Sequence, residues 1–367
     1  MKKSRLIFIL IIVFILSGCS SKSVINVEKD YIYLRSQDLY QIEATHSLGQ
    51  DLTYKATNEI ASVSKEGLVT ALSLGKCEII ISSKKTITKK IIIEVVEPKE
   101  LRVHFIDVGQ ADSILAILPN DEALLIDCGL DHYSTRDDAS YPSWNNIKLA
   151  IDGEEVSTIN HLIITHNHSD HYYYLPSILN NYQVNNIYSS GSTRTNSQYL
   201  NILKAIKKAG LVIQTVKEKD FIIDEGYLQL QVVTTLVVKE TEDINYSSVM
   251  AKLTYYNRSF MFTGDAGYSY GDGEGRALAS GINLQSDVLK VGHHGSKNSS
   301  GNPFLKAVNP QYAIITTAKL TMTGHPHEPA LNRLRQYAKT ILETKDYGTI
   351  TFYTDGFDLT YTTSKQP

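Results

Sequence analysis

The chain has 367 residues and carries 36 lysines and arginines against 39 aspartates and glutamates, a formal net charge of -3. This length predicts about two to three domains. The charge balance excludes a global basic surface of the kind that binds nucleic acid, although local basic patches stay open. Besides Cys19, the sequence contains only Cys77 and Cys128, which fall in different predicted domains, so we do not expect a disulfide framework.

Residues 1–19 have the pattern of a secretory signal peptide. A basic start is followed by an apolar run from Leu6 to Leu16, which is too short to cross a bilayer. The next residues, up to Cys19, resemble the lipobox of bacterial lipoproteins, and this resemblance implies lipid attachment at Cys19. We therefore expect an extracytoplasmic protein held at the bacterial cell membrane by lipid. An uncleaved signal anchor is the alternative.

Residues 20–98 predict a linker followed by a small all-β sandwich. Short apolar runs such as Tyr31–Leu34, Cys77–Ile81 and Lys90–Val96 are separated by turn-forming residues. The run from Ala61 to Gly75 resembles the signature of the group 2 bacterial immunoglobulin-like domain. The resemblance implies a spacer or adhesive module for cell-wall or surface contact, without catalytic residues. We place the domain boundary at Pro98.

The hexapeptide His166–His171 is the most informative stretch of the chain. It places three histidines and an aspartate directly after the apolar run His161–Thr165, which predicts a buried strand. Imidazole nitrogens and carboxylate oxygens are the ligands that zinc and similar divalent ions prefer, and the spacing of these four residues can serve two ions. The alternative is a polar loop with ordinary surface histidines, which suits one isolated histidine better than four potential ligands.

The rest of residues 99–367 repeats one arrangement, in which a predicted strand ends in polar residues beside glycine. The segments with this arrangement are Phe105–Gln110, Ala123–Gly129, Thr263–Asp265, Leu289–Ser296 and Gly324–His327. Strand ends of this kind can assemble one site from distant parts of a sequence.

These motifs together resemble the metallo-β-lactamase superfamily, and more narrowly the hydrolase domain of ComEC-type competence proteins. The resemblance covers Leu101 to Phe357, and the runs Phe105–Gln110, Asp287–Ser296 and His325–His327 are specific to that branch. It implies an αββα sandwich in residues 99–367, and hence an α+β chain with the small β-sandwich in front. It also implies hydrolysis by a metal-activated water, with phosphodiesters in DNA or RNA as the leading substrates.

The resemblance also implies a role for each candidate residue. His166 and His168 would hold the first of two divalent ions, Asp170 and His171 the second, and Asp265 would bridge both. His294 would complete the second group, with His293 as the alternative, because neighbours on a strand point to opposite faces. Asp127 would orient a metal-binding histidine from behind, as outer carboxylates do.

Four further residues flank this set. His325 and His327 are candidates for protonating the leaving group or steadying a phosphate oxygen. Lys290 and Lys297 lie near the double histidine, where they would offset phosphate charge or simply be solvated.

The sequence departs from the superfamily pattern at Asn245–Val249, where many members carry another metal-binding histidine. The competence branch tends to have a serine there, and we place Ser247 in the outer contacts of the site. With one histidine fewer, manganese, which tolerates oxygen ligands, becomes as plausible as zinc.

Three other functions compete with a nuclease or phosphodiesterase. Surface anchoring suits a hydrolase of cell-envelope phosphodiesters, such as teichoic-acid or phospholipid substituents. A surface adhesion protein with a non-catalytic hydrolase scaffold is the non-enzymatic alternative, and the near-complete ligand set argues against it. The missing histidine disfavours β-lactam hydrolysis.

Overall fold

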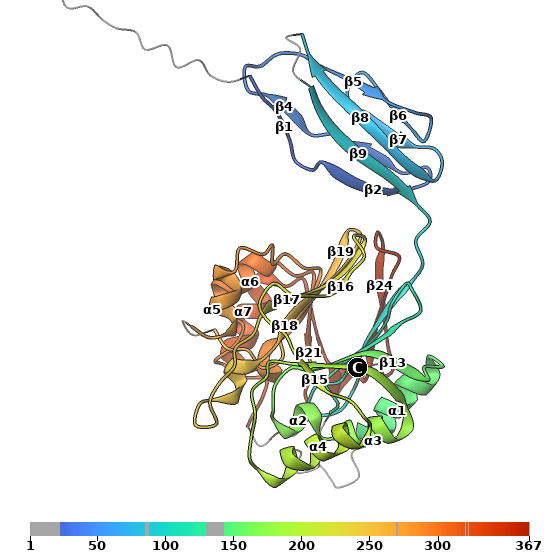
Figure 1. The fold of residues 1–367 in the computed structure, drawn as a ribbon. Coiled ribbons are helices and arrows are strands. Elements are labelled where there is room, and N and C mark those ends of the chain that lie inside the picture. Colours follow the sequence, from blue (N-terminus) through green and yellow to red (C-terminus); the bar gives the residue numbers. More distant parts are fainter. Residues whose placement is uncertain are drawn as a thin grey trace, which may run out of the picture. The chain divides into compact units, whose positions relative to one another are not determined.

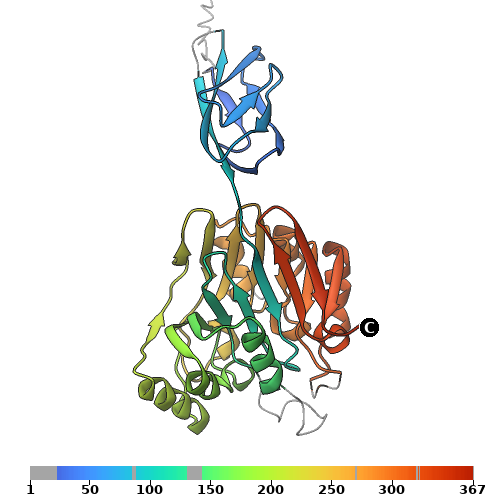
Figure 2. The ribbon, with the colours of Figure 1, turned by 90° about the vertical axis from the view of Figure 1, so that its right-hand side faces the viewer.

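The computed structural model describes residues 23–84, 88–129, 143–268, 271–319, 321 and 323–366. The expected signal peptide and lipobox lie outside the described residues. The chain divides into two compact units, Met1–Glu97 and Pro98–Pro367, which Figures 1 and 2 show from two sides. Within the described ranges, none of the helices combines the length and hydrophobicity needed to span a membrane.

The first unit consists of strands, in agreement with the all-β prediction. A four-stranded sheet has the order β2 (Tyr31–Arg35), β9 (Thr88–Val96), β8 (Gly75–Ser83) and β5 (Leu52–Ala56). The other strands form a three-stranded and a two-stranded sheet: β3 (Leu39–Gln41), β7 (Leu68–Ala71), β6 (Ala61–Val63), and β1 (Ile25–Val27), β4 (Ala44–His46). Every second side chain of β8 and β9 is buried, and Ile79 pairs with Ile91 in the core. The assignment to the bacterial immunoglobulin-like family stays a prediction.

The second unit is built on two sheets. The larger has the order β15 (Ile213–Thr215), β14 (Gln183–Ser189), β13 (Thr158–Ile164), β12 (Ala123–Ile126), β11 (Ile114–Ile117), β10 (Leu101–Phe105), β23 (Ile350–Thr354) and β24 (Leu359–Thr363). The smaller has the order β16 (Phe221–Asp224), β17 (Leu228–Thr234), β18 (Met250–Tyr255), β19 (Arg258–Phe262), β20 (Val288–Lys290), β21 (Tyr312–Ile315) and β22 (Thr340–Glu343).

Helices cover the outer face of each sheet (Figure 1). Those beside the larger sheet are α1 (Ser143–Gly153), α2 (Ser169–Tyr172), α3 (Leu175–Asn181) and α4 (Ser197–Lys208). Those beside the smaller sheet are α5 (Gly273–Ala279), α6 (Asn302–Val308) and α7 (Glu328–Tyr337). A short helix, α8 (Thr344–Tyr347), follows β22. The predicted αββα sandwich and the α+β class are confirmed.

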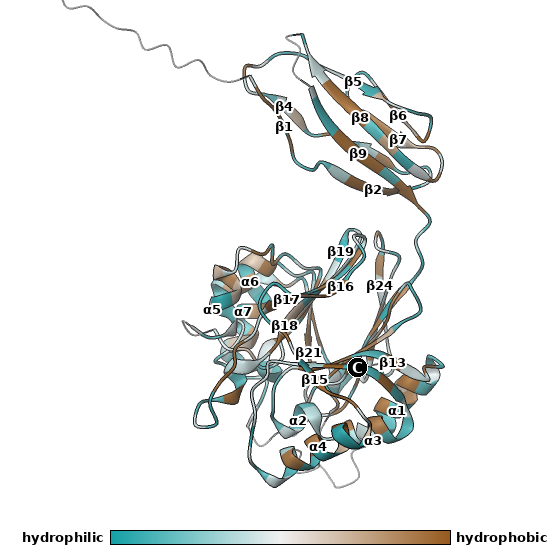
Figure 3. Ribbon diagram, viewed as in Figure 1, coloured by the Kyte–Doolittle hydropathy of each residue, from teal (hydrophilic) through white to brown (hydrophobic). Residues whose placement is uncertain are grey.

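Alternating side chains of the central strands enter different cores. On β12, Leu124 and Ile126 face a core shared by both sheets, whereas Ala123 and Leu125 pack under the helices of the larger sheet. This period of two is what a strand buried on both faces requires. Figure 3 shows the hydrophobic residues concentrated along such strands.

The strand directions bring the candidate residues to one edge. β12 and β13 are parallel neighbours in the larger sheet, and β19 and β20 are parallel neighbours in the smaller sheet. The carboxyl ends of parallel strands meet at the same edge, where α/β proteins commonly bind ligands. Asp127, the hexapeptide, Asp265 and the double histidine each follow one of these four strands.

Candidate metal centre

Four side chains from three segments form a closed group. Asp170 and His171 lie in α2, Asp265 follows β19, and His294 lies in the 3-10 helix η3 (Gly292–Gly295). One ligand atom from each residue lies within 4.8 Å of the other three. His171 Nε2 is 3.4 Å and His294 Nε2 is 3.6 Å from Asp265 Oδ1, and His294 Nε2 is 3.6 Å from Asp170 Oδ2.

A second, more open group surrounds the other oxygen of Asp265. His166 Nε2 is 3.9 Å and His293 Nε2 is 3.6 Å from Asp265 Oδ2. His168 Nδ1 lies 3.0 Å from His166 Nε2. Bonds of about 2.0–2.1 Å from a tetrahedral ion would set its ligand atoms about 3.3–3.4 Å apart. The contacts of the closed group therefore have the dimensions of an ion site, whereas the open group is less compact.

Unsatisfied polar atoms support this interpretation. Buried His171 Nε2, His294 Nε2 and Asp265 Oδ1 have no hydrogen-bond partner among the described residues. Such atoms are costly to bury alone and are unusual in folded proteins. All three belong to the closed group, so a cation placed within it would satisfy them together. The donor set, nitrogen and carboxylate oxygen, fits a divalent ion of the zinc or manganese kind.

The electrostatics also favour a cation. Burial opposes charge on His171, yet the carboxylates of Asp265, Asp127 and Asp170 raise its pKa well above the usual value. Burial likewise opposes charge on Asp265, but the neighbouring histidines hold its pKa well below the usual value. In the metal-free protein a protonated imidazole thus supplies the positive charge that this acidic pocket requires.

The double histidine is not on a strand, and the expectation that only one of its rings could face the site is wrong. His293 and His294 follow β20 in the left-handed conformation, with φ/ψ of 49°/49° and 51°/27°. This turn directs both rings to Asp265. Such conformations cost side-chain-bearing residues of order 1–3 kcal/mol each and occur mainly at functional sites.

Asp127 lies behind His171, as the sequence predicted. Its Oδ2 accepts a hydrogen bond from His171 Nδ1 at 2.7 Å and another from Thr165 Oγ1 at 2.7 Å. The backbone N–H of Thr165 donates to Oδ1. This carboxylate fixes the ring so that Nε2 points at the closed group, which is the usual function of such an outer contact.

Two further buried residues, Lys290 and Asp112, support the site in a role that the sequence did not predict. Lys290 is fully buried, so it cannot reach a substrate, and its Nζ lies 2.5 Å from Asp112 Oδ2. Lys290 Nζ is also 3.9 Å from Asp265 Oδ1 and donates to the carbonyl of Gly264. Asp112 Oδ1 accepts from Thr316 Oγ1, and His294 Nδ1 donates to the Thr316 carbonyl. The only sequence signal for Asp112 was its position two residues after the run Phe105–Gln110.

The serine that contacts the centre is Ser248, not Ser247. The Ser247 hydroxyl donates to the carbonyl of Ile244 at 2.7 Å, because the 3-10 helix η2 (Ile244–Ser247) turns it back on itself. Ser248 Oγ instead accepts from the backbone N–H of Asp265 at 3.1 Å. The turn needs a glycine at Gly264, whose φ is +51° and where a Cβ would lie 3.0 Å from Thr165.

His325 and His327 lie beside the open group rather than in it. The ring of His325 is 5.3 Å from that of His293 and 4.5 Å from that of His327. Gln110 Nε2 lies 3.4 Å from His325 Nδ1, while Thr323 donates to Gln110 Oε1. Burial and the neighbouring histidines lower the pKa of His325 to about 3. Its ring is therefore neutral near pH 7. Because the amide nitrogen of Gln110 can only donate, His325 Nδ1 accepts from it and Nε2 carries the proton.

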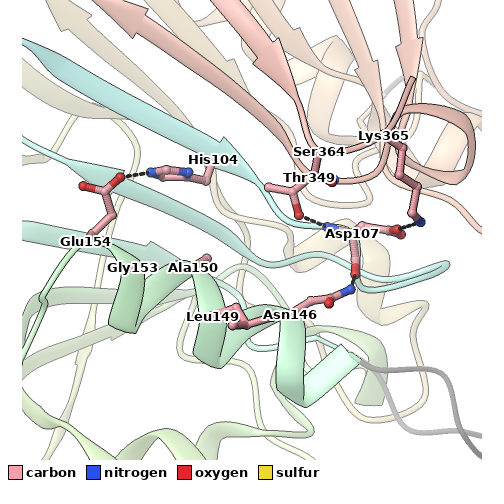
Figure 4. Close-up of a pocket in the computed structure, with 10 residues that line it drawn as sticks. All are labelled: His104, Asp107, Asn146, Leu149, Ala150, Gly153, Glu154, Thr349, Ser364 and Lys365. Carbon is pink, nitrogen blue, oxygen red and sulfur yellow. Dashed lines mark hydrogen bonds and ion pairs between the residues drawn. The ribbon is translucent and has the colours of Figure 1, made fainter. Parts of the chain in front are cut away.

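The segment that carries Gln110 and Asp112 is fixed at its start by Asp107. In a cavity of about 420 Å³, Asp107 forms an ion pair with Lys365 Nζ at 2.7 Å, and Asn146 donates to its carbonyl (Figure 4). Thr349 Oγ1 accepts from its backbone N–H. These contacts anchor one end of the loop between β10 and β11.

The chain is also similar to known proteins. The family described as "Metallo-beta-lactamase superfamily" matches residues 106–318. ComE operon protein 3 of Bacillus subtilis is 29% identical over 260 residues, which cover 69% of this chain and 33% of that protein. Competence protein ComA of Neisseria gonorrhoeae is 42% identical over 72 residues, which cover 20% of this chain and 10% of that protein. The chain thus spans a third or less of the length of these relatives.

Solved structures show weaker likeness. CmlA, a diiron β-hydroxylase from Streptomyces venezuelae, is 15% identical with a TM-score of 0.41, covering 68% of this chain and 53% of that chain. A diphosphatase of the PhnP family is 12% identical with a TM-score of 0.39, covering 66% of this chain and 94% of that chain.

Proposed function

Because the chain belongs to the metallo-β-lactamase superfamily, we propose that residues 99–367 form a hydrolase that uses two divalent ions and a metal-activated water. One observation carries this proposal: the two carboxylate oxygens of Asp265 face two different groups of histidines. A carboxylate in that position can bridge two ions. Two metal ions held in this way would supply an activated water and would stabilise the charge that develops on the attacked group.

We propose phosphodiesters as the substrate class, with DNA or RNA first. The similarity to relatives named as competence proteins supports this choice, as does the absence of the extra histidine from Asn245–Val249. Two ions suit phosphodiester cleavage because they can stabilise the attacking and the leaving oxygen together.

The protein's own residues have separate tasks in this proposal. His166 and His168 would hold the first ion, and Asp170, His171 and His294 the second. Asp127 and Lys290 keep the closed group in place from behind.

His325, with its neutral ring and its proton on Nε2, would donate a hydrogen bond to a phosphoryl oxygen. His327 Nδ1 accepts a hydrogen bond from the backbone N–H of Lys297, which leaves its Nε2 to donate a hydrogen bond to substrate as well. The substitution His325→Ala should then slow diesters with good and poor leaving groups equally. A loss confined to poor leaving groups would identify His325 as the acid that protonates the departing oxygen.

An activity panel tests the reaction. Residues 20–367, stripped of metal and reloaded with manganese or zinc, should cleave DNA, RNA or a nitrophenyl phosphodiester, and His168→Ala should abolish this cleavage. Cleavage of only teichoic-acid or phospholipid phosphodiesters would assign an envelope substrate. Metal binding without cleavage of any of these would favour the adhesion scaffold, and turnover of a β-lactam alone would refute the phosphodiester assignment.

We also propose that Cys19 carries lipid and holds the protein outside the cytoplasm, with the first unit as a spacer toward the cell wall. The lipobox-like sequence before Cys19 supports this. Fatty-acid labelling should mark the parent and not Cys19→Ala; equal labelling of both would refute the anchor.

A further inference from the structure

The open group lacks a ligand that the superfamily usually supplies. The segment Asn245–Val249 has no histidine, and Ser248 contacts the backbone of Asp265 instead. With Asp265 as a bridge, His166 and His168 give the first ion three protein ligands, one fewer than Asp170, His171, His294 and Asp265 give the second. A fourth side chain at the open group would make the two sets of ligands equal in number.

We propose that His293 supplies this missing ligand, so that the two adjacent histidines serve different ions. His293 Nε2 lies 3.6 Å from Asp265 Oδ2, the oxygen that also faces His166. His294 Nε2 lies 3.6 Å from Asp265 Oδ1, the oxygen that faces His171. The proposal rests on the two-ion site proposed above. It gives the first ion, held by His166 and His168 after β13, an additional ligand from the end of β20.

The backbone explains how neighbours can divide in this way. In an extended strand, adjacent side chains point to opposite faces, and one ring would be lost to the site. Because both residues are left-handed, the rings of His293 and His294 both point toward Asp265, and each ring approaches a different oxygen of that carboxylate. Function is a sufficient reason for side-chain-bearing residues to keep a conformation that suits glycine.

Contacts around the turn hold it in place. Gly295 has a φ of +83°, and a Cβ there would lie 2.5 Å from Pro326 Cβ. The backbone N–H of His327 donates to the Gly295 carbonyl at 2.9 Å. The segment His325–His327 therefore packs directly on the turn that presents His293.

The two ions should differ in affinity as a result. The closed group has four buried or nearly buried ligands within 4.8 Å of one another. The open group depends on His293, whose side chain is 30% exposed. We expect the first ion to bind more weakly and to lie where solvent and substrate can reach it.

The substitution His293→Gly tests the assignment without disturbing the backbone, because glycine adopts the left-handed conformation readily. Equilibrium dialysis against manganese, followed by elemental analysis, should give two ions per chain for the parent and one for His293→Gly. The retained ion should keep the tighter of the two affinities. If the glycine variant does not fold, His293→Asn replaces it, because asparagine also tolerates the left-handed conformation. His293→Asn should weaken the affinity of the open group for its ion at least tenfold.

His325→Ala is the matched control, since it removes the imidazole next to His293 and should leave two ions bound. Two ions with unchanged affinities in His293→Gly would overturn the inference and leave the proposed function intact. Loss of both ions in that variant, at an unchanged melting temperature, would also overturn it. A parent that binds fewer than two ions would refute the two-ion site itself, and the inference with it.

Discussion

Replacing Lys290 by methionine should destabilise the metal-free protein by about 3–5 kcal/mol, the range for removing one partner from a buried ion pair. Lys290 and Asp112 have side-chain exposures of 0% and 2%, and their charged atoms are 2.5 Å apart. Methionine nearly fills the volume of the lysine stem, so the loss would come from Asp112 without its ammonium partner rather than from a cavity. Asp112 would keep the hydrogen bond from the Thr316 hydroxyl, while His294 Nδ1 lies 3.7 Å and His171 Nδ1 3.8 Å from its oxygens.

Urea denaturation in the presence of a chelator measures this loss. Trp144, the single tryptophan of the sequence, lies in α1, so its fluorescence reports on the second unit alone. The double variant Lys290→Met/Asp112→Asn should recover most of the stability, because replacing both members of a buried pair is often nearly neutral. Exposed Lys297→Ala is the control and should change stability by less than about 0.5 kcal/mol. A single variant within about 1 kcal/mol of the parent, or a double variant no more stable than the single, would refute the reasoning.

Three further predictions test other parts of the structure. Burial raises the pKa of Glu274 from 4.5 to about 8, although the backbone N–H groups of Gly301 and Ser300 oppose this. The folded state therefore binds more protons than the unfolded state between these values, and the contribution of Glu274 to stability falls as pH rises from about 4.5 to about 8 and is level above. The unfolding free energy of Glu274→Gln minus that of the parent should increase across that window, because only the parent loses stability there. A difference independent of pH would contradict the raised pKa. Asp265→Ala should deplete both ions in elemental analysis, because its two oxygens face both groups, and retention of one ion would argue against a bridge. Deleting residues 20–98 should leave turnover of a small soluble diester nearly unchanged, since every candidate ligand follows Pro98; a collapse in turnover with intact Trp144 fluorescence would show that the first unit contributes to the site.

Local sequence was sufficient wherever the information lies within a few neighbouring residues. The hexapeptide encodes four ligand types at a spacing that one strand end and one helical turn can present, and the structure brings His166, His168, Asp170 and His171 together as expected. Strand ends rich in glycine and acidic residues likewise predicted that Asp127 and Asp265 would meet them.

Local patterns also misled where a short segment leaves its regular conformation. The double histidine follows a strand, but its left-handed turn presents both rings, which no period of two predicts. The 3-10 helix before β18 moves the serine contact by one residue, from Ser247 to Ser248.

By itself the sequence predicted the all-β unit, because periodicity is a property of the chain, and its resemblance to the metallo-β-lactamase superfamily implied the αββα sandwich and the candidate ligands. Only the tertiary structure decided which side chains are buried together. Lys290 and Lys297 look alike in sequence, yet one is sealed against Asp112 and the other is exposed. A charged side chain is buried only where a partner from a distant segment compensates it, and that pairing exists only once β10, β11 and β20 have come together in the fold.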